Sequence, residues 1–114
     1  MKLKEIFETY VDLNREYVAY INEVINKNFE GYSEDEVMKN LIKSKEKFQE
    51  LMTEVDKIES EEEDGIFLKD VKYGLVDALF LAIDLYNFYY SKQLERFKMR
   101  GVNYIRKGRV ISFF

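Results

Sequence analysis

Apolar residues recur every three or four positions through most of the chain, which is the spacing of amphipathic helices. This pattern predicts three long helices, over residues 2–29, 34–58 and 66–100. Long helices joined by short connections pack antiparallel to their neighbours. The sequence therefore predicts a mostly α fold, in which residues 1–100 form an up-down-up bundle within a single domain.

The boundary between the first two helices carries clear local signals. Gly31 is suited to the left-handed backbone conformation that closes a helix. Ser33 is followed three residues later by Glu36, which is the spacing of a capping box. Tyr32 and Val37 occupy the hydrophobic-staple positions around this box. The second helix is therefore predicted to begin directly after the serine.

The second boundary is a run of acidic residues, because positions 59–65 hold five carboxylates in seven residues. Like charges at this density disfavour a helix, so we predict a turn. The alternative is one continuous helix over residues 34–100, which a glycine at position 65 alone would not prevent.

The end of the chain changes from helical spacing to alternation. Residues 102–106 and 109–113 flank Lys107 and Gly108, a pair suited to a two-residue hairpin turn. We predict that residues 102–114 form a short β-hairpin or an extended tail packed on the bundle, with a frayed or helical tail as the alternative. In the hairpin register one face holds four apolar side chains: Val102, Tyr104, Ile111 and Phe113.

The third predicted helix is unusually apolar, since 15 of the 20 residues from Val71 to Tyr90 are apolar. A helix of this kind needs cover over most of its circumference. Two partner helices supply part of that cover, and a second copy of the chain is predicted to supply the rest. The residues predicted to form this interface in a homodimer are Leu79, Ile83, Tyr86, Tyr89 and Tyr90.

Charge is distributed unevenly along the 114 residues, although the net charge is only −4. Residues 1–64 carry a net −9 and residues 65–114 a net +5. Such asymmetry is typical of a protein that meets a charged partner. We expect the basic end to steer an acidic protein or the acidic part of a second copy, with nucleic acid as the alternative ligand. The predicted basic patch is Lys98, Arg100, Arg106, Lys107 and Arg109.

Composition excludes several classes of enzyme, because the chain contains no cysteine and no histidine. This removes disulfides, thiolate nucleophiles, Cys-based metal sites and imidazole bases. The sequence also has no glycine-rich phosphate loop and no assembled nucleophile–base set. We therefore expect no catalytic residue, no metal and no cofactor.

One pattern of acidic residues suggests a different class of protein, a metal-dependent enzyme. Aspartates recur every seven residues at positions 70, 77 and 84, so Asp70, Asp77 and Asp84 fall along one line of a helix. They form either a ladder of metal ligands or the solvent-facing stripe of that helix. The stretch 72–80 resembles the second acidic motif of all-α nucleotide pyrophosphohydrolases in placing Asp77 before an apolar run. That resemblance implies a magnesium-dependent enzyme, but Tyr73 and Gly74 stand where the family has glutamates.

Two further features of the sequence concern the interior of the bundle and the location of the protein. Asn14 lies in the apolar register of the first helix, which predicts a polar layer inside the bundle. No segment has the pattern of a signal peptide or of a membrane span, so we expect a cytoplasmic protein without membrane contact. The predicted function is a non-enzymatic protein–protein interaction or regulatory module that self-associates through its third helix.

Overall fold

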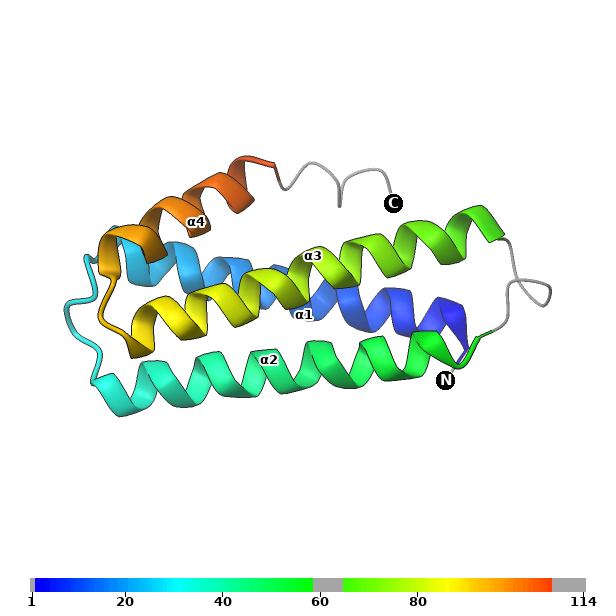
Figure 1. Cartoon of the computed structure of the whole chain (residues 1–114), viewed down its shortest axis with the longest axis horizontal. Coiled ribbons are helices and arrows are strands. Elements are labelled where there is room, and N and C mark those ends of the chain that lie inside the picture. Colours follow the sequence, from blue (N-terminus) through cyan, green and yellow to red (C-terminus); the bar gives the residue numbers. More distant parts are fainter. Residues whose placement is uncertain (1, 59–64, 108–114) are drawn as a thin grey trace.

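The computed structural model of the protein describes residues 2–58 and 65–107. Within these ranges the backbone forms four helices and no strand, which confirms the all-α class. The helices are α1 (Leu3–Asn26), α2 (Glu34–Asp56), α3 (Gly65–Tyr90) and α4 (Leu94–Arg106). Figure 1 shows that each runs antiparallel to the one before it, and that the short α4 lies beside α1 and α3.

The connection between α1 and α2 is fixed by backbone conformation. Asn28 and Phe29 have positive φ angles of 52° and 66°. Their N–H groups donate to Ile25 O and Val24 O, both at 2.9 Å, which closes the helix in a Schellman motif. Gly31 is also left-handed, with φ of 85°, but it follows this closure. The prediction that the glycine ends the helix is therefore wrong.

The start of α2 confirms the predicted cap. The Oγ of Ser33 accepts a hydrogen bond of 3.1 Å from the backbone N–H of Glu36. Acidic residues fill the first turn of the helix, where its dipole favours negative charge.

The predicted third helix over 66–100 is wrong, because α3 ends at Tyr90 and the chain reverses. Lys92 has a φ of 60°, and its N–H donates to Tyr89 O at 3.1 Å. The N–H of Gln93 donates to Phe88 O at 2.8 Å, so this helix also ends in a Schellman motif. The reversal buries Phe97 of α4 completely, with its ring centroid 5.2 Å from that of Phe29.

The predicted hairpin is not supported in its first half, because residues 102–106 belong to α4. Helical geometry places Phe97, Gly101 and Tyr104 on one side of α4, where each reaches the bundle. The second predicted strand, 109–113, lies outside the described residues, as does most of the predicted acidic turn. The alternative of one helix over 34–100 is wrong, because α2 and α3 are separate helices packed side by side.

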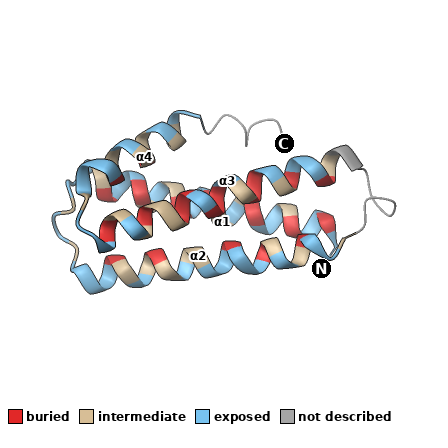
Figure 2. Cartoon of the chain, viewed as in Figure 1, coloured by how far each residue is buried: buried red, intermediate tan, exposed pale blue. Residues whose placement is uncertain are grey.

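The core runs along the inward faces of the helices (Figure 2) and includes fully buried side chains from each of them, such as Ile6, Val37, Leu75 and Phe97. Asn14 is also completely buried, which confirms the predicted polar layer. In the described part of the chain, each helix is too short or too polar to cross a membrane.

Candidate functional site

The outward side of α3 carries large apolar side chains that the bundle leaves uncovered. Tyr73, Phe80 and Tyr90 are 60%, 56% and 71% exposed. Val76 and Ile83 between them are half-buried, and Asn87 is exposed. We call the six residues at 73, 76, 80, 83, 87 and 90 the outer stripe of α3.

The outer stripe has the spacing of a coiled-coil seam. Its members alternate by steps of three and four residues, which is the pattern of the a and d positions of a heptad. Tyr73, Phe80 and Asn87 take the a positions. The stripe can therefore offer another helix a line of knobs along five turns of α3.

Charged side chains border the outer stripe on both flanks. Lys72 lies on the α2 side, where Lys45 of α2 also places its Nζ 4.6 Å from the ring centroid of Tyr86. Asp77 and Asp84 lie on the α4 side, and Asp84 accepts a hydrogen bond of 2.9 Å from the Nε of Arg100. One flank is thus basic or aromatic and the other is acidic.

The five residues predicted for the dimer interface lie in different surroundings. Leu79 and Tyr89 are each only 8% exposed and belong to the core of the single chain. Tyr86 is half-buried and stacks on Tyr90, with ring centroids 6.1 Å apart. Ile83 and Tyr90 are members of the outer stripe. Sequence reasoning missed the other four members, although their three-and-four spacing is visible in the chain.

Much of the cover that α3 needs comes from α4. This helix packs on one flank of α3, so part of the cover that was predicted to come from a second copy comes from the same chain. Among the described residues of α3, the large apolar side chains that remain exposed all belong to the outer stripe.

Four of the five residues of the predicted basic patch lie in the described part of the chain, and their surroundings differ. The Nζ of Lys98 donates a hydrogen bond to the side chain of Asn28 and lies 3.6 Å from Glu95 Oε1. Arg100 is engaged by Asp84. Arg106 and Lys107 are exposed at the end of α4, and Arg109 lies outside the described residues. Binding of an acidic partner by these last residues stays a prediction.

The three aspartates spaced by seven residues along α3 lie in different surroundings. Asp70 and Asp77 are exposed, while Asp84 is held by α4. Among the residues that the structure describes, no three acidic side chains come close enough together to hold a metal ion.

A polar layer crosses the interior between α1, α3 and α4. The hydroxyl of Tyr104 donates to Asn14 Oδ1 at 2.9 Å. Burial raises the pKa of the Tyr104 hydroxyl well above its usual value, and that of Tyr17 further still. Burial, with a smaller contribution from the Asp77 carboxylate, raises the pKa of Tyr10 to about 12. These phenols stay protonated at neutral pH, and among them Tyr104 donates the hydrogen bond to Asn14.

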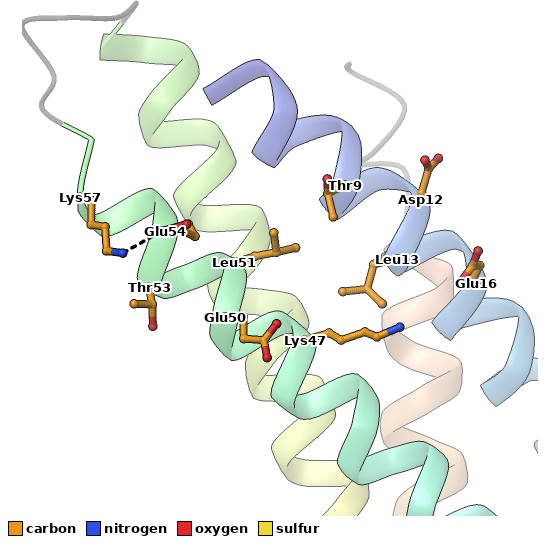
Figure 3. A pocket seen from close by; sticks show the side chains of 10 residues that line it. All are labelled: Thr9, Asp12, Leu13, Glu16, Lys47, Glu50, Leu51, Thr53, Glu54 and Lys57. Carbon is orange, nitrogen blue, oxygen red and sulfur yellow. Dashed lines mark ion pairs between the residues drawn. The ribbon is translucent and has the colours of Figure 1, made fainter. Parts of the chain in front are cut away.

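An open cleft of about 710 Å³ separates α1 from α2 (Figure 3). Leu13 and Leu51 point toward each other across it, and the other lining side chains are polar or charged. Lys57 Nζ lies 2.9 Å from Glu54 Oε2 at one end. The remaining lining residues are Thr9, Asp12, Glu16, Lys47, Glu50 and Thr53. This mixture of both charges around a small apolar floor is typical of a solvated surface between two helices.

The outer stripe therefore remains the surface that combines exposed apolar area with a regular spacing. Comparisons of the chain with known protein families, curated proteins and solved structures found no match.

Proposed function

We propose that the protein is a non-enzymatic interaction module that associates with a second copy of itself through the outer stripe of α3. The observation that carries this proposal is the exposure of Tyr73, Phe80 and Tyr90 at heptad spacing on one helix. Large aromatic side chains dominate the energy of protein interfaces when a partner covers them. Left in water, the same side chains forgo about 25 cal/mol for each Å² of apolar surface.

The test is the oligomeric state of the chain and of two matched variants. Phe80→Glu puts a carboxylate at the centre of the stripe. Met99→Glu makes the same change at a residue that is 65% exposed on α4, outside the stripe. Both positions face solvent in the single chain, so both variants should keep the helical circular dichroism of the wild type.

Sedimentation velocity over a concentration series should give a dimer for the wild type and for Met99→Glu. Phe80→Glu should raise the dissociation constant by about 30-fold or more, because a buried aromatic hot spot contributes at least about 2 kcal/mol. A wild type that stays monomeric at high micromolar concentration would overturn the proposal, and so would equal effects of the two variants.

A further inference from the structure

We propose that the second copy docks on the outer stripe in a parallel, in-register arrangement, so that each stripe residue meets its own counterpart. This inference rests on the proposed self-association and adds the direction and register of the partner helix. Three features of α3 carry it: the length of the heptad pattern, the polar residue within it and the charges on its flanks.

The heptad pattern fixes the mode of packing. A seam that repeats every 3.5 residues on average keeps two helices in contact when they cross at about 20° and wind to the left. The outer stripe holds that repeat from Tyr73 to Tyr90 without a break. A parallel and an antiparallel partner both suit this spacing, so the choice between them depends on the side chains.

Asn87 favours the parallel arrangement. In a parallel pair, Asn87 lies opposite Asn87 of the partner subunit, and the two amides can hydrogen-bond to each other across the seam. In an antiparallel pair centred on the stripe, Asn87 lies opposite Val76, which offers no partner. An amide buried without a hydrogen bond is destabilising by about 1–3 kcal/mol, so the polar residue selects the arrangement in which it is paired.

The charged flanks favour the same direction. Lys72 directly precedes the first a residue, and Asp77 directly follows the first d residue, so they take g and e positions. In a parallel pair each g residue faces the e residue five positions further along the partner. Lys72 then faces Asp77 of the partner subunit, and symmetry repeats this pair. An antiparallel pair instead brings the two acidic flanks together, with Asp77 near Asp84 of the partner subunit.

The absence of cysteine makes the direction measurable, because one introduced cysteine is the only thiol in the chain. Tyr73→Cys should form a disulfide-linked dimer under mild oxidation if the helices are parallel. In an antiparallel pair the two thiols lie about 25 Å apart along the helix axis and cannot join. The control is Met99→Cys, which is exposed on α4 and should stay monomeric on a reducing-agent-free gel.

A mixture of Tyr73→Cys and Tyr90→Cys chains tests the opposite direction. In an antiparallel pair these two positions face each other, so a mixed disulfide between the two variants would overturn the inference while leaving self-association in place. A dimer in solution that forms neither cross-link would overturn it as well. A monomeric protein would overturn the inference and the proposed function together.

A charge exchange provides a second readout. Lys72→Asp should weaken dimerisation by several-fold to about tenfold, because two facing pairs become repulsive and each exposed pair contributes up to about 1 kcal/mol. Lys72→Asp combined with Asp77→Lys should restore the wild-type dissociation constant. A double variant that dimerises no better than Lys72→Asp alone would contradict the parallel register.

Discussion

The hydroxyl of Tyr104 on α4 donates a hydrogen bond of 2.9 Å to Asn14 Oδ1 on α1, across 90 positions of sequence. Asn14 is completely buried, and within the described part of the chain its Nδ2 has no hydrogen-bond partner. The bond therefore joins the last helix to the first through a polar group that has given up its contact with water. This arrangement makes the docking of α4 sensitive to both side chains.

Removing only the phenol should be destabilising. Tyr104→Phe leaves Asn14 buried with its oxygen unpaired as well, so the free energy of unfolding should fall by about 1–3 kcal/mol. Replacing both residues, as Asn14→Leu with Tyr104→Phe, removes the unpaired groups and should recover most of that loss. Chemical denaturation of the wild type, both single variants and the double variant measures the coupling. Strictly additive losses would show that the two residues do not act as a pair.

Asn14 also illustrates what the sequence could predict. A polar residue in the apolar register of a helix is either buried or interrupts the apolar face, and the position of Asn14 in the middle of its helix favoured burial. The capping serine at position 33 was equally readable, because its hydrogen bond reaches only to Glu36. Features that depend on three or four neighbouring residues could therefore be predicted from the sequence.

The position where α3 ends could not be predicted from the sequence, because it depends on contacts between residues that are distant along the chain. Tyr90, Leu94 and Phe97 keep the helical spacing across the polar residues 91–93. A chain that folds back can therefore show the same periodicity as one that continues as a helix. Lys92 adopts a left-handed conformation that glycine or asparagine usually signals. What decides the reversal is the packing of Phe97 on Phe29 and Tyr89.

The outer stripe could not be predicted from the sequence for a related reason. Because most residues between 71 and 90 are apolar, periodicity does not distinguish the inward side of the helix from the outward side. Leu79 and Tyr89 belong to the core of the single chain, where Tyr89 packs against Phe97 of α4. Once that helix is placed, the remaining exposed residues form the outer stripe.

The left-handed Lys92 offers a simple way to stabilise the turn between α3 and α4. A φ of 60° crowds the Cβ of any residue other than glycine, at about 1 kcal/mol. Lys92→Gly should therefore raise the free energy of unfolding by about that amount. Lys69→Gly, at an exposed position within α3, is the control and should lower it through the poor helix propensity of glycine. Thermal and denaturant unfolding measure both, and a loss of stability in Lys92→Gly would contradict the expected relief of backbone strain at this residue.

The contact between α4 and α1 depends on a glycine. A Cβ at Gly101 would lie 2.7 Å from Ile25 Cδ1 and 3.2 Å from Ile21 Cγ2, closer than van der Waals contact allows. Gly101→Ala should destabilise the fold by about 1–3 kcal/mol, although alanine favours helix formation. Combining it with Ile25→Val shortens the side chain that clashes and should recover part of the loss. A Gly101→Ala variant at least as stable as the wild type would contradict this prediction and show that the side chains of Ile25 and Ile21 can move aside.

The buried phenol of Tyr10 should make stability depend on pH in the alkaline range. Burial, aided by the Asp77 carboxylate, raises the pKa of Tyr10 from 10.0 to about 12. The folded chain therefore holds this proton more tightly than the unfolded chain does. The stability that Tyr10 contributes is complete below pH 10.0 and is lost as the pH rises toward about 12.

Between about pH 9 and about pH 11.5 the free energy of unfolding of the wild type should fall by about 1–2 kcal/mol more than that of Tyr10→Phe. Urea denaturation at each pH gives the comparison, and equal slopes for the wild type and Tyr10→Phe would show that the phenol is not held protonated by the fold.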